Sequence, residues 1–336
     1  MWALKNRTTY GAARNWIRDK NGVHHWLVAV KATFDIAAGG RVRLADQQSL
    51  PLLAPVHRGD PQTSSLRIDA DLLAPKPGTD VCLDACAHAA KGRPAPIVPV
   101  SLRIAAIDKT LLVHGLRVYY RGARGPAMSS PRPFVTQPIH YEWAFGGTDT
   151  TDPDPRKHRI DARNPVGKGI AVDPASLENQ PAHAIEYPRG DPRTSGPGGF
   201  GPIASFWSPR LERAGTYDAR WEAAKKPLLP DDYDERFASS APDDQRSSVA
   251  LRGGEPVQLT NLTPGGELRF DLPRRSLAFV TRIAGRREEH AGTLASVFIA
   301  TEEMKLSMIW QTTLKVRARE VDELDDTTIA EKSFLT

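Results

Sequence analysis

Hydrophobic and polar residues alternate along the N-terminal third of the chain, as they do in strands that bury one face. The stretch HHWLVAVKATFDI (24–36) alternates and is rich in β-branched residues, and the following AAGGRVRLA adds a Gly-Gly turn and a return strand. Residues 79–89 predict another strand, and residues 98–120 predict a hairpin that turns at Asp108-Lys109. This third of the chain is therefore predicted to be strand-rich.

The last third returns to the same pattern. Residues 255–273 predict a hairpin around a Pro-Gly-Gly turn, and residues 276–285 predict a strand. Residues 292–316 predict a second hairpin, which turns near Glu302-Glu303. The end, REVDELDDTTIAEKSFLT, is acidic and poorly periodic, and we interpret it as a helix or a loose tail.

The middle of the chain has a different character. Between Arg121 and Glu255 it holds 17 of the 28 prolines and 14 of the 26 glycines, together with many aromatic residues. A flexible linker would be rich in Ser, Glu and Lys and poor in aromatics. We therefore expect an ordered, irregular layer packed on a β scaffold.

The stretch GFGPIASFWSPRLERAGTYDARW (199–221) is the densest aromatic part of this layer and fits neither a helix nor a strand period. A short helix is expected over residues 218–226, with Asp218 as its N-cap. The aromatic residues of this stretch can either pack the scaffold or meet a partner, and the sequence leaves both readings open.

These patterns together predict a mainly β fold of mixed, mostly antiparallel sheets, built from both chain ends. The irregular middle is long, ordered and rich in Pro and Gly, with a few short helices. We predict a single domain over 1–320, with strand-rich parts at 23–120 and 255–318 and the loop-rich layer at 121–254. Residues 319–336 are predicted to form an acidic C-terminal tail.

Charge and composition narrow the classes of protein. The formal charge is only +5 over 336 residues, and no long basic run is present, so we do not expect nucleic-acid binding. The N-terminus has no long apolar segment and no run approaches 18 apolar residues, which argues against a secretory signal and a membrane helix. Two cysteines indicate a reducing compartment without a disulfide framework.

Candidate catalytic and metal-binding motifs fail on spacing. ARNPVGKGI (162–170) lacks the first Gly and the final Ser or Thr of a phosphate-binding loop, and LPDDYDERF does not fit a calcium loop. Cys82, Asp84, Cys86 and His88 would share one face of a single strand. The two cysteines would then lie about 13 Å apart along it, too far for one metal ion. We therefore expect no metal site and no cofactor.

Nine stretches, in order, resemble the bacterial family catalogued as domain of unknown function twenty-one sixty-nine, and they cover about residues 25 to 315. They are KATFDI, KPGTDV, PFVTQPIHYEWAFGG, NPVGKG, GFGPI with FWSPR, AGTYDARW, LPDDYDERFASSAPDDQ, GGEPVQLTNLTPGGELRFDLP and MIWQTTL. The resemblance implies a cytoplasmic adaptor or chaperone of type VI secretion, not an enzyme. It would bind a secreted effector, a spike-tip PAAR protein or a VgrG protein, with no membrane, nucleic-acid or small-molecule partner.

Within the resemblance we separate glycines, which serve backbone conformation, from side chains that could frame a partner interface. Alanine replacement of two of these side chains, Trp207 and Arg210, is expected to weaken partner capture while the fold stays soluble. The candidate partner-binding residues are Phe145, Phe200, Trp207, Arg210, Tyr217, Asp218 and Trp221.

Two other classes remain open. A β-rich carbohydrate-active hydrolase would place acids such as Glu142, Asp149 or Asp218 as a carboxylate pair in a Trp-lined cleft. A structural component of the secreted spike would leave the cell together with the effector.

Overall fold

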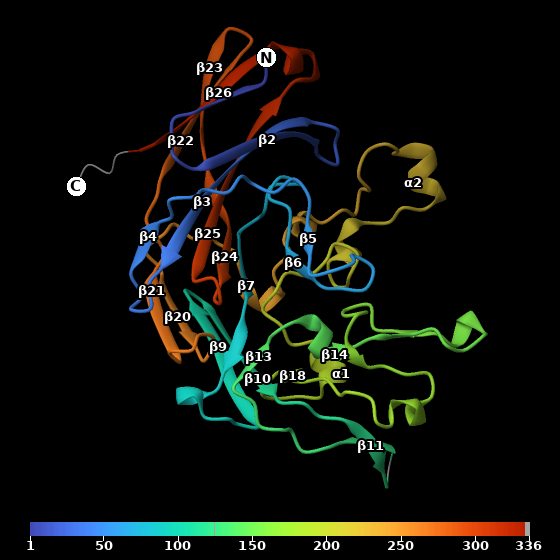
Figure 1. The fold of residues 1–336 in the computed structure, drawn as a ribbon. Coiled ribbons are helices and arrows are strands. Elements are labelled where there is room, and N and C mark those ends of the chain that lie inside the picture. Colours follow the sequence, from blue (N-terminus) through green and yellow to red (C-terminus); the bar gives the residue numbers. More distant parts are fainter. Residues whose placement is uncertain (124, 333–336) are drawn as a thin grey trace.

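Strands from the two ends of the chain pair in one seven-stranded sheet, as the sequence predicts. The computed structural model describes residues 1–123 and 125–332. In this sheet the strand order is β19-β7-β24-β25-β3-β2, with β4 beside β3 (Figure 1). The strands are β2 (Gly11–Arg18), β3 (His24–Ile36), β4 (Val42–Leu44), β7 (Thr79–Asp84), β19 (Arg246–Ser247), β24 (Thr293–Ala300) and β25 (Lys305–Val316).

The centre of this sheet joins the first and last thirds of the chain. β25 runs antiparallel to β3 in continuous register, from Lys305 opposite Asp35 to Val316 opposite His24. β24 and β25 form the hairpin expected at the C-terminal end, and β7 joins β24 in parallel. Because β3 is central, almost every residue from Trp26 onward is buried. The fold is mainly β, as predicted.

A five-stranded sheet has the order β18-β10-β9-β20-β21. The hairpin within it turns at Ala105-Ala106, so the turn predicted at Asp108-Lys109 is wrong. Lys109 is instead a buried strand residue whose ammonium donates to Asp244 and Gln245, and Ala105 takes the left-handed turn conformation at φ 48°. The strands are β9 (Ile97–Ile104), β10 (Ile107–His114), β18 (Ile185–Glu186), β20 (Pro256–Thr260) and β21 (Glu267–Asp271).

The predicted acidic tail is largely a strand. Residues 324–331 form β26, which lies between two partners in a four-stranded sheet of order β1-β26-β22-β23. The alternation was hidden because adjacent polar residues are both buried: Trp26 donates its indole N–H to the buried Thr327, and the buried Asp326 pairs with Lys5. Residues 333–336 lie outside the described residues. The other elements are β1 (Ala3–Asn6), β22 (Leu277–Ile283), β23 (Arg286–Ala291) and the 3-10 helix η8 (Ala318–Glu323).

The middle of the chain is irregular and ordered, as expected. Its α-helices are short, and Asp218 caps the second of them by accepting a hydrogen bond from the Trp221 amide at 2.8 Å. The elements are β11 (Tyr119–Gly122), β12 (Gly125–Met128), β13 (Thr136–Pro138), η2 (Tyr141–Trp143), β14 (Phe145–Gly146), β15 (Thr148–Asp149), η3 (Pro155–Lys157), β16 (Arg159–Ile160), β17 (Lys168–Gly169), η4 (Pro174–Leu177), α1 (Pro192–Ser195), η5 (Leu211–Ala214), α2 (Ala219–Ala224), η6 (Glu235–Ala238) and η7 (Asp243–Gln245).

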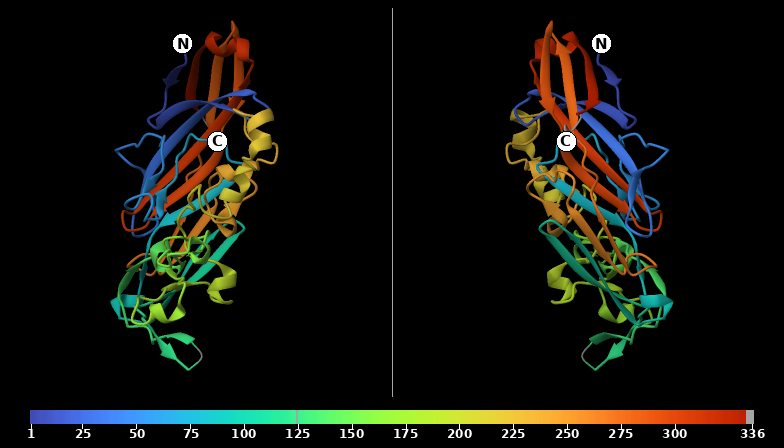
Figure 2. Two further views of the ribbon diagram at one scale, coloured as in Figure 1. Left: turned by 90° about the vertical axis from the view of Figure 1, so that its right-hand side faces the viewer. Right: turned by 90° about the vertical axis from the view of Figure 1, so that its left-hand side faces the viewer.

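One large cluster of buried side chains joins the sheets to this layer. It includes Trp26 and Phe34 from the seven-stranded sheet, Phe279 from the four-stranded sheet, and Phe200 and Trp207 from the irregular layer. The molecule is elongated, with the four-stranded sheet at one end and the β11–β12 hairpin at the other (Figure 2). The remaining elements are β5 (Val56–His57), β6 (Leu66–Ile68), β8 (Cys86–His88) and η1 (Ala90–Gly92).

The predicted division into one domain and a tail stays a prediction. Within the described residues, no helix has the length and apolar character needed to cross a membrane.

Candidate functional site

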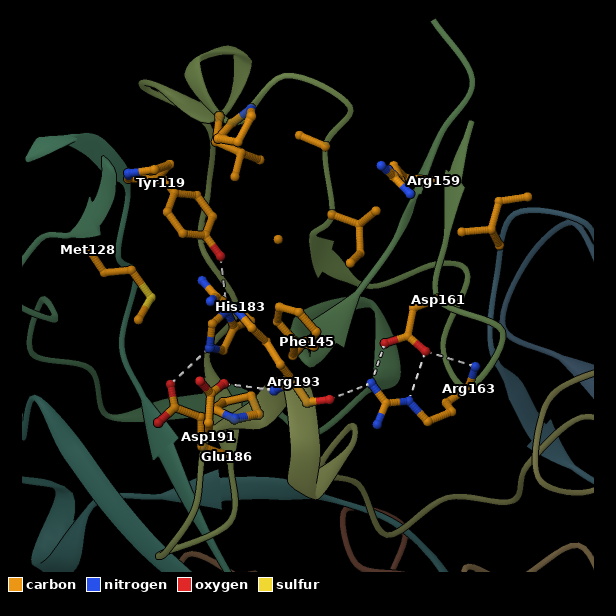
Figure 3. Close-up of a pocket in the computed structure, with 18 of the residues that line it drawn as sticks. Tyr119, Met128, Phe145, Arg159, Asp161, Arg163, His183, Glu186, Asp191 and Arg193 are labelled. Carbon is orange, nitrogen blue, oxygen red and sulfur yellow. Dashed lines mark hydrogen bonds and ion pairs between the residues drawn. The ribbon is translucent and has the colours of Figure 1, made fainter. Parts of the chain in front are cut away.

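A groove of about 1060 Å³ opens in the irregular layer, next to the edge strand β18 (Figure 3). Its lining comes from several stretches between residues 117 and 212, which include the β11–β12 hairpin, η4 and α1. Its volume lies just above the usual range of pockets that enclose a small ligand. The groove is therefore built almost entirely from the part of the chain that has no regular period.

A buried cluster of polar side chains forms the floor of the groove. The Arg117 guanidinium donates to Glu186 Oε1 at 2.5 Å and to the carbonyl oxygen of His183 at 2.6 Å. Two imidazoles approach the same carboxylate, His183 Nε2 at 3.1 Å and His114 Nε2 at 3.5 Å. The Tyr119 hydroxyl lies 3.1 Å from His183 Nδ1 and points toward it (Figure 3).

Electrostatics keep this cluster charged. Burial disfavours the ionised form of Glu186, but the contacts from His114, His183 and Arg117 outweigh it and hold the carboxyl pKa well below its usual range. Burial raises the pKa of the Tyr119 phenol, which therefore stays neutral. At neutral pH the floor thus contains a fixed carboxylate–guanidinium pair beside a neutral hydroxyl. A general acid or base works best with a pKa near the ambient pH, which Glu186 does not have.

Strand pairing brings the floor residues together. β18 pairs antiparallel with β10, with Glu186 opposite Leu112, so residues near 114–119 meet residues 183–186. A glycine completes the wall: Gly169 has φ +117°, and a Cβ there would lie 2.7 Å from the Tyr119 hydroxyl. A larger residue at 169 would therefore both strain the backbone and displace the tyrosine.

Hydrogen bonds hold the loops at the edge of the groove, here called the rim, in place. Asp161 accepts from the amide and the guanidinium of Arg163, at 3.0 and 2.9 Å, and Arg163 also donates to the carbonyl oxygen of Arg193 at 3.1 Å. Asp191 caps α1 by accepting from the Arg193 amide at 2.9 Å. These bonds hold the loops in place without a regular element, so the rim is preorganised.

The walls combine apolar side chains with cations that have no ion pair. Ile160 is 59 % exposed and Met128 is also exposed, although both line the groove. Arg159 and Arg193 line it too, and neither side chain has an ion-pair or hydrogen-bonding partner among residues 1–123 and 125–332. Glu212 adds an exposed acid to the same lining.

Four of the seven predicted partner-binding residues are buried, so their side chains are not offered to a partner in this structure. Phe145 lies in the wall of the groove, with its ring edge-on to His183 at 5.4 Å between centroids. The other three, Phe200, Trp207 and Arg210, are 0 %, 1 % and 2 % exposed and belong to the core. These side chains pack the scaffold in this structure, and a role in partner binding stays a prediction.

Arg210 connects the irregular layer to the rest of the molecule, whereas Trp207 packs against another residue of the layer. The Arg210 guanidinium lies 2.9 Å from Asp69 Oδ2 and donates to the carbonyl oxygens of Phe237 and Ile203, at 2.8 and 2.9 Å. Trp207 packs edge-on against Tyr141, with 5.8 Å between ring centroids.

The other three predicted residues lie around α2, on a loop that projects from the side of the sheets (Figure 1). Tyr217 is 52 % exposed and packs edge-on against the half-buried Trp221. Asp218 is exposed and serves as the helix cap. This surface is separate from the groove, since none of the three lines it.

The cysteine-containing stretch does not form one continuous strand, because β7 ends at Asp84 and β8 begins at Cys86. Burial raises the pKa of both thiols, that of Cys86 to about 11, so neither is a ready thiolate. Among the described residues, no group of three or more His, Cys, Asp and Glu side chains is arranged to hold a metal ion.

The acids considered for glycoside hydrolysis serve local structure. Glu142 accepts hydrogen bonds from the Ser65 amide and hydroxyl, at 2.7 and 2.8 Å. Asp149 accepts from the Val172 amide at 2.8 Å, and Asp218 caps α2.

Sequence reasoning did not single out the residues of the floor, Arg117, His183 and Glu186, nor Arg193 on the rim. A usable signal was the spacing of His183 and Glu186 in HAIE, which sets an imidazole and a carboxylate near each other. Nothing in the sequence places Arg117 beside them, because that contact depends on the pairing of β10 with β18.

A protein-family model described as an uncharacterized protein conserved in bacteria (DUF2169) matches residues 21–311. The matched region contains every residue that lines the groove and all seven predicted partner-binding residues. No curated protein and no solved structure matches the chain.

Proposed function

The chain belongs to the bacterial family DUF2169, and from this premise we propose that it is an adaptor or chaperone of type VI secretion. In this proposal it binds an effector, a spike-tip PAAR or VgrG protein, or both, and assists effector loading through protein–protein contacts. It acts in the cytoplasm, without a cofactor, a small-molecule substrate or nucleic acid. The ordered resemblance of nine sequence stretches is the source of the type VI secretion assignment.

The observation that carries a binding role is the groove. Its walls expose apolar side chains such as Ile160 next to cations without ion pairs, Arg159 and Arg193. Exposed apolar surface with a polar rim is typical of sites that contact other proteins. Turn hydrogen bonds and the Asp191 cap fix the loops beforehand, so little conformational entropy is lost on binding.

The chemistry of the floor favours binding over catalysis. Glu186 is held ionised by Arg117 and two imidazoles, so it is a poor proton shuttle at neutral pH. The acids Glu142, Asp149 and Asp218 are each engaged in a local hydrogen bond. For this reason the carbohydrate hydrolase is not our preferred function.

The surface around α2 is a second candidate contact in the same proposal. Tyr217 exposes half of its surface next to Trp221, and Tyr and Trp are common anchors of protein interfaces. Within this segment the Trp221 indole donates to the carbonyl oxygen of Leu228 at 2.9 Å, which fixes the position of the ring.

The experiment is a deletion of the gene in the native host, complemented by the wild-type chain. We expect the effector to disappear from the culture supernatant in the deletion strain and to return on complementation. Affinity-tagged chain should co-purify with the effector or a spike-tip protein from the cytoplasmic fraction. Unimpaired effector secretion in the deletion strain would contradict the proposal, and recovery of the chain itself from the supernatant would favour a spike component instead.

A further inference from the structure

We propose that the groove above Tyr119 and His183 binds a short extended segment of a partner protein, with one carboxylate of that segment seated on Arg193. Apolar side chains of the same segment would pack against Met128 and Ile160. This inference rests on the proposed adaptor function and specifies where, and by what chemistry, the partner is recognised.

The position of Arg193 favours a carboxylate. Its side chain lies beside His183 in the groove (Figure 3) and has no ion pair among the described residues. Its cation, like that of Arg117, lowers the pKa of the Tyr119 phenol against the effect of burial, which places both guanidiniums near the hydroxyl. Arg117 is already neutralised by Glu186, whereas no acid of residues 1–123 and 125–332 pairs with Arg193. An incoming carboxylate would pair with Arg193.

One buried polar atom of the floor, Arg117 Nε, lacks a hydrogen-bonding partner in the described residues. His183 is 4 % exposed and Arg117 is 7 % exposed, and both line the groove. Both His183 nitrogens are engaged, Nδ1 by the Tyr119 hydroxyl and Nε2 by Glu186, whereas Arg117 Nε has no partner in the described residues. Buried polar atoms that lack partners are uncommon, and a ligand or ordered water often satisfies them.

Two acids limit the charge of the segment. Asp191 lies at the start of α1, with one carboxylate oxygen bound to the Arg193 amide, and Glu212 lines the groove without an ion pair among the described residues. A uniformly acidic segment would be repelled by these acids. The lining therefore suits a single carboxylate flanked by apolar residues rather than an acidic tract.

The shape of the groove favours a peptide over a compact metabolite. A small ligand is usually buried over most of its surface, whereas here the apolar lining includes Ile160, which stays 59 % exposed. The lining spreads over stretches from the β11–β12 hairpin to α1, around a volume of about 1060 Å³. An extended segment can contact several of these stretches at once.

The test uses the purified full-length chain and a displayed library of random peptides. We expect enrichment of peptides with one Asp, Glu or free C-terminal carboxylate next to Leu, Ile, Val or Phe. The Kd of an enriched synthetic peptide is then measured by fluorescence anisotropy with wild type, Arg193→Glu and Arg189→Glu. Arg189 is the matched control, because it is an exposed arginine four residues away that does not line the groove.

We expect Arg193→Glu to weaken binding at least tenfold and Arg189→Glu to change it less than twofold. Replacing the peptide's acid by its amide should weaken binding to wild type but have little further effect in Arg193→Glu. Three outcomes would overturn the proposal: no enrichment, enriched peptides without a carboxylate, or equal losses in both variants. Binding of N-acetylglutamate amide as tightly as the peptide would also overturn it, in favour of a small-ligand site.

The secretion assay separates this inference from the proposed function. If Arg193→Glu abolishes peptide binding while the deletion strain secretes normally, the groove site stands and the adaptor role falls. If secretion requires the chain but Arg193→Glu secretes normally, the adaptor role stands and the groove is not its partner site.

Discussion

Arg210 and Asp69 form an ion pair of 2.9 Å in which the two side chains are only 3 % and 9 % exposed. The pair joins the irregular layer, just before η5, to the residue that follows β6. Two backbone carbonyls accept further hydrogen bonds from the same guanidinium, which compensates for part of its desolvation. A residue that the sequence marked as an interface candidate is therefore a structural connection.

We predict that Arg210→Ala destabilises the protein by about 3–5 kcal/mol, because the buried Asp69 would lose its ion-pair partner. The measurement is chemical denaturation at pH 7. Arg220→Ala, at an exposed arginine with no ion pair in the described residues, should change stability by less than about 0.5 kcal/mol. The double replacement Arg210→Leu with Asp69→Leu should lose less unfolding free energy than Arg210→Ala does. An equal loss in the two variants would contradict this explanation.

Trp207 and Tyr217 are predicted to behave in opposite ways, although they lie in the same stretch. Trp207→Ala removes a side chain that is 1 % exposed and should cost about 3–5 kcal/mol in unfolding free energy. Tyr217→Ala removes one that is 52 % exposed and should cost less than about 1 kcal/mol. Thermal or chemical denaturation of both variants checks this, and a soluble, fully stable Trp207→Ala would show that the aromatic layer is not part of the core.

Glu186→Gln should lose stability in a pH-dependent manner. The folded-state pKa of Glu186 is lowered, so its contribution is present above the ordinary pKa of about 4.3 and is lost as pH falls below it. We expect the free energy of unfolding of Glu186→Gln to be about 3 kcal/mol lower than that of wild type at pH 7. This difference should be smaller at pH 3. Denaturation at several pH values measures the gap. A gap that stays constant over this range would mean that the carboxylate charge is not what stabilises the floor.

His290 should make the wild type less stable on mild acidification. It lies between the hydroxyls of Thr281 and Thr312, and burial lowers its pKa to about 4. The unfolded chain takes up a proton near pH 6.5 while the folded state stays neutral, so stability falls between about pH 6.5 and 4 and then levels off. His290→Gln should reduce this loss by about 1 kcal/mol between pH 6 and 5. An NMR titration should place the His290 pKa near 4, and a value near 6.5 would refute the explanation.

Hydrophobic patterning predicts strands and turns correctly where the preferences of the local sequence agree with the contacts made in the folded protein. β3 has the bounds 24–36 that the sequence predicts, and the hairpin of β24 and β25 turns where Glu302 and Glu303 indicate. The turn after β9 was missed because Ala105-Ala106 carries no turn signal, while Asp108-Lys109 does. Tertiary contacts of Lys109 with Asp244 and Gln245 decide that register.

Buried polar residues explain the other error in the fold. β26 looks aperiodic because the adjacent Asp326 and Thr327 are both buried, on opposite faces of the strand, where Lys5 and the Trp26 indole satisfy them. A pattern that counts only apolar residues cannot show such positions.

The candidate site was less predictable than the fold. Proline and glycine content identified an ordered layer, but composition does not report which side of a loop faces the core. Trp207 and Arg210 therefore could not be separated from Tyr217 without coordinates. The floor depends on a pairing between β10 and β18 that joins residues about 70 positions apart, and no local period encodes it.

The pairing of β25 with β3 has a consequence for biosynthesis. Lys305 lies opposite Asp35 and Val316 opposite His24, so β3 gains β25 as a neighbour only after residues 305–316 have been made. Until then β3, with its long run of apolar residues from Trp26, can pair only with β2 and β4, and the edge that β25 covers stays open. Contacts of such sequence separation slow folding and leave hydrophobic strands exposed to aggregation. A nascent chain arrested before residue 305 should therefore depend on general chaperones at the ribosome to stay soluble.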